Sequence, residues 1–352
     1  MSAPPVARRG SSWLAVLVLL VAVPAAGPAL GCDAHSVYVE PDRIPQRRRL
    51  TLGVAEQFTH MGTVMIDGHE VPSEGERLNS SITQVFATYG FTDWIGVQLN
   101  LPIVARDYRR LENGRLTSGS VSGFGDLTLV AIGTPFDAEL PVGRLTASLI
   151  GGLKLPTGDA SLLAEELGAL RGVARRRDAR DGGVTHHGPG PGHPAPSPGG
   201  RRTVSAIRGH DLAIGSGSVD GVVGGQLGWR RGRAFAFGFL QYAVRSEGAY
   251  AYTFANELSW SGGPGYDVLT GDTWSLGVQA VLSGDTKGND TQAGIKLDDT
   301  ARTRLYVGPA ILFDWTDRLA AEVGVDVPVV RDETSLQMVP DVRVRAGLSW
   351  RF

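Results

Sequence analysis

The clearest pattern in this sequence is a two-residue alternation of apolar and polar side chains that recurs from residue 49 to the C-terminus. In the last segment every second position from Val342 to Phe352 is apolar, and the positions between are Arg, Gly or Ser. A period of two is typical of a β-strand whose faces meet different environments. Twelve such segments are predicted, at 49–59, 79–89, 95–103, 122–133, 145–155, 217–229, 233–245, 256–269, 274–283, 303–313, 319–329 and 342–352.

The predicted connectors alternate in length. Short ones lie at 90–93, 230–232, 270–272 and 314–317, with a somewhat longer one at 134–143. Long ones lie at 60–78, 105–121, 156–216, 246–255, 285–302 and 330–340. An even strand count with short turns at one end and long loops at the other is the pattern of bacterial outer-membrane barrels. The sequence therefore predicts an all-β, antiparallel up-and-down transmembrane barrel of about 12 strands over residues 49–352, with periplasmic short turns.

Tryptophan positions support this reading. Five of the six Trp residues after residue 31 fall at predicted short-turn ends, namely Trp94, Trp229, Trp274, Trp315 and Trp350, and Trp260 falls near a long-loop end. Aromatic girdles are expected at membrane interfaces. A soluble β-protein whose Trp residues cap a core remains the alternative.

The first 31 residues are typical of a secretory signal peptide. Arg8 and Arg9 precede an apolar run over 13–23, and Pro24 and small residues follow. Two forms of cleavage stay open. The stretch before Cys32 resembles a lipoprotein box, which makes Cys32 a lipidation candidate, and ordinary cleavage after Gly31 is the alternative. Residues 32–48 would then form a periplasmic N-terminal arm.

Composition narrows the classes of protein. The net charge is −2, so no basic excess predicts a nucleic-acid partner. The single cysteine excludes an intramolecular disulfide and a Cys-ligated zinc site. After residue 31 no apolar run approaches the roughly 20 residues of a membrane helix. The expected location is the outer membrane of a Gram-negative-type bacterium, with its lipid and its barrel-insertion machinery as partners; the oligomeric state stays open.

Polar positions opposite the apolar face would line the lumen. The candidate lumen or selectivity residues are Asp126, Lys154, Gln279, Glu322, Asp326, Arg343 and Arg345. Rings of charged side chains can select ions in channels. A network of ion pairs that holds the barrel closed is the alternative interpretation.

Residues 160–210 form an unusual predicted outer loop, low in complexity and rich in His, Pro, Gly and Arg. His186, His187 and His193 within it are candidate metal ligands, because neutral imidazole binds zinc or copper. A flexible loop without a site, or an out-of-frame stretch of coding sequence, would explain the same composition.

Four short motifs occur in order: 89–94 (YGFTDW), 123–129 (GFGDLTL), 153–159 (LKLPTGD) and 214–221 (IGSGSVDG). The chain thereby resembles the outer-membrane barrel family named after the meta-pathway of phenol degradation, whose members are labelled transporters. The resemblance implies a passive channel for small, in part hydrophobic, molecules, without cofactor or catalytic residues. It also implies that the terminal Phe352 belongs to the signal read by the insertion machinery.

Two other functions stay open. One is a structural or loop-mediated binding barrel without an open pore. A hydrolase is remote, because no His lies on a predicted strand to activate a Ser.

Overall fold

The computed structural model describes residues 45–168 and 204–352. The predicted signal peptide, the lipidation candidate Cys32, the arm up to residue 44 and the three candidate metal ligands His186, His187 and His193 lie outside these residues.

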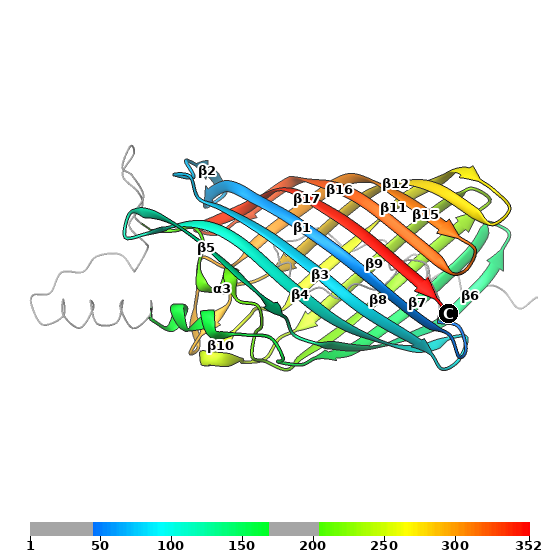
Figure 1. The fold of residues 1–352 in the computed structure, drawn as a ribbon, viewed down its shortest axis with the longest axis horizontal. Helices are drawn as coiled ribbons and strands as arrows, with labels where there is room; N and C mark the ends of the chain where they lie inside the picture. Colours follow the sequence, from blue (N-terminus) through cyan, green and yellow to red (C-terminus); the bar gives the residue numbers. More distant parts are fainter. Residues whose placement is uncertain (1–44, 169–203) are drawn as a thin grey trace, which may run out of the picture.

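Twelve antiparallel strands form one closed barrel, which confirms the predicted fold class (Figure 1). Their chain order is also their spatial order, and β17 pairs with β1 to close the sheet. The strands are β1 (Leu50–Ile66), β3 (Arg77–Gly90), β4 (Ile95–Glu112), β6 (Thr128–Leu140), β7 (Gly143–Lys154), β8 (Asp220–Arg231), β9 (Ala234–Val244), β11 (Glu257–Thr270), β12 (Trp274–Lys287), β15 (Arg302–Trp315), β16 (Leu319–Glu333) and β17 (Leu336–Arg351).

The other helices and strands lie at the end of the barrel that carries the long loops. They are β2 (His69–Val71), β5 (Arg115–Phe124), β10 (Tyr252–Thr253), β13 (Thr291–Gln292), β14 (Ile295–Lys296), η2 (Ser161–Leu163), α3 (Gly209–Leu212) and η3 (Ala249–Ala251). Strand β5 pairs with the second half of β4, and β6 pairs with its first half, so β5 and β6 follow one line with a break at 125–127. No helix in 45–168 or 204–352 is long and apolar enough to span a membrane.

Several strands are longer than the sequence pattern predicted. The predicted connector 105–121 is wrong, because β4 and β5 form a hairpin there with the turn Asn113-Gly114, whose φ angles are 51° and 74°. The predicted connectors 134–143 and 330–340 likewise shrink to two-residue turns. The predicted strand 122–133 is split by the break between β5 and β6. These segments carry no clean apolar alternation, so their pairing left little signal in the sequence.

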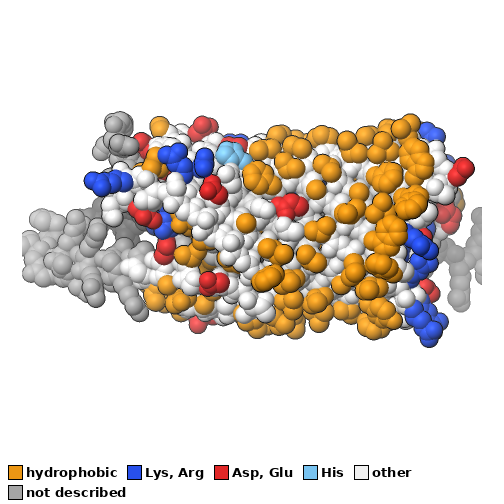
Figure 2. Space-filling model, viewed as in Figure 1, with side chains coloured by type: hydrophobic (Ala, Val, Ile, Leu, Met, Phe, Trp, Pro, Cys, Tyr) orange, Lys and Arg blue, Asp and Glu red, His pale blue; other side chains and the backbone are white. Residues whose placement is uncertain are grey.

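The two faces of the sheet differ as predicted. Outward positions near the middle of the strands are apolar and exposed, for example Leu99, Leu149, Val223, Ile311 and Val323. On the face in view, Figure 2 shows a broad apolar band, with most charged side chains toward the two ends of the barrel and one acidic group within the band. Trp315 and Trp350 lie 6.0 Å apart at the short-turn end, where the aromatic girdle was predicted.

The long-loop end is filled by a packed cap, made here of residues 155–168, 204–219, 245–256 and 288–301. Its core contains Ile207, Leu212, Leu163 and Tyr252, each 1% exposed or less. The cap is tied to the wall by Arg106, whose Nη1 donates to the carbonyl of Ala213 at 2.7 Å. The lumen is therefore bounded by this cap at the long-loop end and by the short turns at the other end.

Candidate functional site

One wall of the lumen is apolar. Strand β9 points three aromatic side chains into the lumen, Phe235, Phe237 and Phe239. They are alternate residues and so lie on one face of the strand, and Ala236 and Gly238 between them face outward. Phe239 packs against a buried cluster from β6, β7 and β8 composed of Val130, Ile132, Ile150 and Val222. An apolar surface thus faces the interior over four neighbouring strands.

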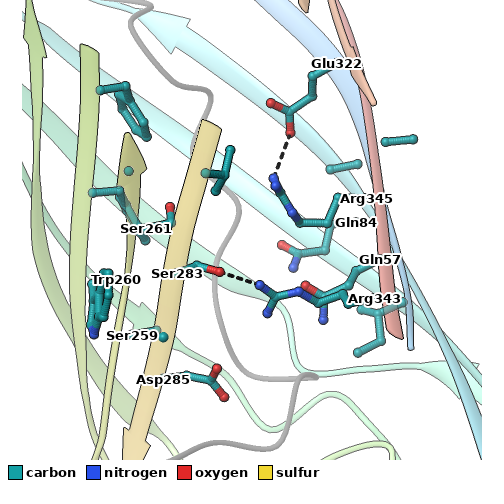
Figure 3. A pocket seen from close by; sticks show the side chains of 18 of the residues that line it. Gln57, Gln84, Ser259, Trp260, Ser261, Ser283, Asp285, Glu322, Arg343 and Arg345 are labelled. Carbon is teal, nitrogen blue, oxygen red and sulfur yellow. Dashed lines mark hydrogen bonds and ion pairs between the residues drawn. The ribbon is translucent and has the colours of Figure 1, made fainter. Parts of the chain in front are cut away.

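The opposite wall carries the charges. Glu322 and Asp326 come from β16, and Arg343 and Arg345 come from β17, which pairs with β16 in the register Asp326↔Arg343. Because these positions alternate with outward Val residues, all four side chains point inward. Gln57 of β1 and Gln84 of β3 extend this wall with neutral amides (Figure 3).

Asp326 is the centre of the ion cluster. Its side chain is fully buried and accepts hydrogen bonds from Arg343 Nε at 3.0 Å and from Arg345 Nε and Nη2 at 2.7 and 3.1 Å. Arg345 also lies 4.0 Å from Glu322. Arg343 donates to Ser283 at 2.6 Å, as Figure 3 shows, and its guanidinium sits 4.0 Å over the ring of Tyr306. Both arginines are therefore held by several contacts, with Asp326 and Glu322 as the two carboxylates that face them.

Two adjoining cavities lie between the walls. One, of about 180 Å³, is lined by the ion cluster, by Gln57 and Gln84, and by Phe237 and Phe239. The other, of about 380 Å³, reaches the short-turn end. Phe237, Gln279 and Glu322 line both cavities, so together they form a route from the short-turn end to the ion cluster.

The structure separates the predicted lumen residues into two places. Glu322, Arg343, Arg345 and Gln279 line the first cavity, and the buried Asp326 lies beside them, bound to both arginines. Asp126 and Lys154 instead form a junction near the cap, where Lys154 Nζ lies 2.7 Å from Asp126 and 2.8 Å from Asp220.

This junction joins three of the motifs seen in the sequence. Asp126 of the first motif accepts hydrogen bonds from the backbone N–H of Gly158 at 3.0 Å and from that of Ser216 at 2.9 Å. Asp159 accepts through its carbonyl from the N–H groups of Ile214 and Gly215. Segments far apart in the chain are thus fastened around one carboxylate.

Three glycines let these segments meet. A Cβ on Gly158 would lie 2.9 Å from backbone atoms of both Gly125 and Gly215, and a Cβ on Gly215 would lie 2.5 Å from the carbonyl carbon of Gly158. We call the contact of Gly125, Gly158 and Gly215 the glycine seam. It closes the wall at the level where β5 gives way to β6.

The sequence interpretation missed several residues that complete these sites. Arg245 is almost fully buried and bridges Asp220 at 3.0 Å and Glu257 at 2.8 Å, which ties β8, β9 and β11 together. The three inward Phe residues of β9 were hidden because both faces of that strand are apolar in sequence. A charged residue directly after a strand, such as Arg245, offers no period-two signal.

The cap holds a buried ion pair. His210 Nδ1 lies 2.9 Å from Glu166 Oε1. Burial alone would lower the pKa of His210, but Asp211 and Glu166 outweigh it and raise that pKa to about 10. Burial likewise opposes ionisation of Glu166, yet His210 lowers the pKa of Glu166 to about 2. Both groups are charged at neutral pH. The described residues contain no cluster of three or more His, Cys, Asp or Glu suited to a metal ion.

Comparison with known proteins places the fold. No family model and no curated protein matches the sequence. Among solved structures, an outer-membrane channel from Pseudomonas putida F1 superimposes with a TM-score of 0.57 at 15% identity, covering 90% of this chain and 100% of that one.

Weaker similarities are to other barrels. The β domain of the Bordetella autotransporter BrkA gives a TM-score of 0.43 at 12% identity, covering 86% of this chain and 99% of that one. The P. putida toluene transporter TodX gives 0.36 at 11%, covering 88% and 91%. The chain therefore shares the barrel fold of an outer-membrane channel.

Proposed function

We propose that this protein is an outer-membrane channel that passes small, partly apolar molecules. The observation that carries the proposal is the lumen itself: a route of two adjoining cavities with a phenylalanine wall on one side and amides and paired ions on the other. The apolar band outside the barrel supports the membrane location.

The chemistry of the two walls favours solutes that are neither ions nor pure hydrocarbons. An apolar wall of Phe237 and Phe239 gains free energy when it contacts an apolar surface. The amides of Gln57, Gln84 and Gln279 offer hydrogen bonds to a polar group on the same solute. Arg343 and Arg345 both donate to Asp326, and Arg345 also lies 4.0 Å from Glu322, so both guanidinium groups are already engaged by carboxylates and should not hold an anion strongly.

A flux assay tests the proposal. Purified protein in liposomes should accelerate entry of small aromatic alcohols relative to sugars of equal mass. Phe237→Ala, which removes the apolar wall, should reduce this preference several-fold. Leu240→Ala on the outward face of the same strand is the matched control, since Leu240 is 48% exposed and lines neither cavity. Equal flux with and without protein would contradict a channel.

A binding barrel without an open pore is the second candidate. The packed cap favours it, because Leu163, Leu212 and Tyr252 are fully buried at the long-loop end. Planar-bilayer recording separates the two functions: discrete conductance steps support the channel, and their absence together with tight solute binding supports the binding barrel.

Other expectations from the sequence accompany the proposal. They are export by residues 1–31, lipidation at Cys32, insertion through the signal at Phe352 and membership of the meta-pathway barrel family. Metal capture by His186, His187 and His193 is also among them. We further propose that Glu322, Asp326, Arg343 and Arg345 set ion selectivity, and that the protein has no enzymatic activity.

A further inference from the structure

The outward surface of β3 and β4 carries two arginines that face each other. In the antiparallel register of these strands Arg77 lies directly opposite Arg109. Both belong to the outward set, because the residues that alternate with them, such as Leu78 and Tyr108, pack against the cap core. Like charges at directly opposed positions destabilise a sheet. Such a pair calls for a compensating anion.

The described neighbours compensate only one of the two charges. Arg77 Nη2 lies 3.2 Å from Asp107 Oδ1, and both side chains are about half exposed. Within 45–168 and 204–352 no ion pair is seen for Arg109. Two cations and one anion leave a local charge of about +1 on a surface where guanidinium groups can bind a phosphate in a bidentate manner.

The surface below the arginines changes in layers. Ile103, Phe124 and Val85 are exposed apolar side chains on β4, β5 and β3. Above them the outward positions become polar. They are Asn79, Ser81 and Thr83 on β3, Asp107 on β4, Ser120 and Ser122 on β5, and Glu56 on β1, whose carboxylate accepts hydrogen bonds from Ser81 and Thr83. The arginine pair follows above this layer, with Ser118 directly opposite Arg109. The order is apolar, then hydrogen-bonding, then cationic.

The distance of the arginine pair from the apolar side chains indicates which class of lipid headgroup can reach it. Arg109 is six residues beyond Ile103, which at 3.3 Å per residue and a tilt near 40° is a rise of roughly 15 Å. A phospholipid headgroup layer is only about 5–8 Å thick. A headgroup that reaches the pair from the same leaflet must therefore carry sugars between its acyl chains and its anionic group.

We propose that Arg77 and Arg109 bind a phosphate on the saccharide headgroup of a glycolipid in the outer leaflet, with the hydrogen-bonding layer below contacting the sugars. This site rests on the proposed outer-membrane location. It lies on the outside of the barrel and is separate from the lumen.

The test is binding to detergent-purified full-length protein, followed by native mass spectrometry and fluorescence competition. The probes are a phosphorylated lipopolysaccharide of lipid A and inner-core sugars, phosphatidylglycerol, and inorganic phosphate. The variant R77Q/R109Q should bind the lipopolysaccharide about 100-fold more weakly, since each charge-assisted contact contributes about tenfold. Phosphatidylglycerol and inorganic phosphate should bind wild type far more weakly than the lipopolysaccharide.

The control variant is R231Q/R233Q, which removes the same charge from the exposed last residue of β8 and from the turn that follows it, at the opposite end of the barrel. It should bind the lipopolysaccharide as wild type does. Unchanged binding by R77Q/R109Q, or inorganic phosphate binding as tightly as the glycolipid, would overturn the site. Fractionation of the wild type away from the outer membrane would contradict the proposed function instead, so the two failures are distinguishable.

Discussion

A charge placed on the outward face of the barrel should destabilise it more than a charge placed on the inward face, and Val323 and Gln279 offer the comparison. Val323 is 54% exposed on the outward face of β16, between Ile311 of β15 and Ala346 of β17. Gln279 points inward from β12 and lines both cavities. The two substitutions are Val323→Arg and Gln279→Arg.

The magnitudes follow from the surroundings. An arginine on the lipid face of a barrel costs about 2–4 kcal/mol near the midplane. Gln279→Arg loses the hydrogen bond that Gln279 donates to the carbonyl of Gly263 at 2.9 Å, a loss of about 1 kcal/mol. The new guanidinium lies near Glu322 and in a polar cavity, so no comparable desolvation opposes it. The two variants should therefore differ by about 2 kcal/mol in unfolding free energy. This corresponds to roughly a 30-fold difference in the ratio of folded to unfolded protein.

Urea unfolding from lipid vesicles, followed by the shift between folded and unfolded gel mobility, measures this gap. Val323→Met is the control, because it keeps an apolar side chain on the lipid face and should change the free energy by less than about 1 kcal/mol. Equal destabilisation by the two arginine substitutions would refute the assignment of faces or the presence of water in the lumen.

Three further predictions address the ion cluster, the C-terminus and the cap. Asp326→Asn frees Arg343 and Arg345 from their shared anion and should shift the bilayer reversal potential toward anion selectivity; an unchanged potential would place the cluster off the conduction path. Phe352→Asp should lower the amount of folded protein in the membrane fraction, because Phe352 is 61% exposed at the short-turn end, and wild-type levels would contradict its role in assembly. The contribution of the pair His210 and Glu166 to stability should be greatest between about pH 4.5 and 6.5. Because the pKa of His210 is raised, its part is lost as the pH rises from 6.5 toward 10; because that of Glu166 is lowered, its part is lost as the pH falls from 4.5 toward 2. Hydrogen exchange of residues 205–216, corrected for intrinsic rates, checks this profile, and His210→Gln should abolish its alkaline limb.

The fold could be predicted from sequence where the two faces of a strand meet different solvents. The segment Val342–Phe352 alternates strictly because its outward side chains lie in the apolar band and its arginines point into the lumen. Beyond the apolar band the strands continue to pair, but their two faces no longer differ in polarity. The sequence pattern therefore did not predict the β4–β5 hairpin. Its turn Asn113-Gly114 was a usable signal, since Asn-Gly favours the positive φ angles of a two-residue hairpin.

The ion cluster and Gln279 were predictable for the same reason, and most of the other residues of the site were not. Alternation alone placed Glu322, Asp326, Arg343 and Arg345 on one face of two adjacent strands. The choice of partners required three-dimensional register, as Lys154 shows: it binds Asp220, which lies 66 positions away in sequence, across the cap segment. Apolar residues that face the lumen, such as Phe237, contradict the simple rule that polar faces point inward.

The glycine seam has a consequence for recognising distant relatives of this chain. A Cβ on Gly158 or on Gly215 would meet the backbone of another member of the seam, so enlarging either residue cannot be offset by shrinking its neighbour, which already lacks a side chain. Substitution is therefore barred at these two separated positions together, whereas most outward positions tolerate any apolar side chain. A search keyed to the spacing of Gly125, Gly158 and Gly215 with their adjoining Asp126 and Asp159 should retrieve barrels of this kind whose overall similarity has otherwise been erased.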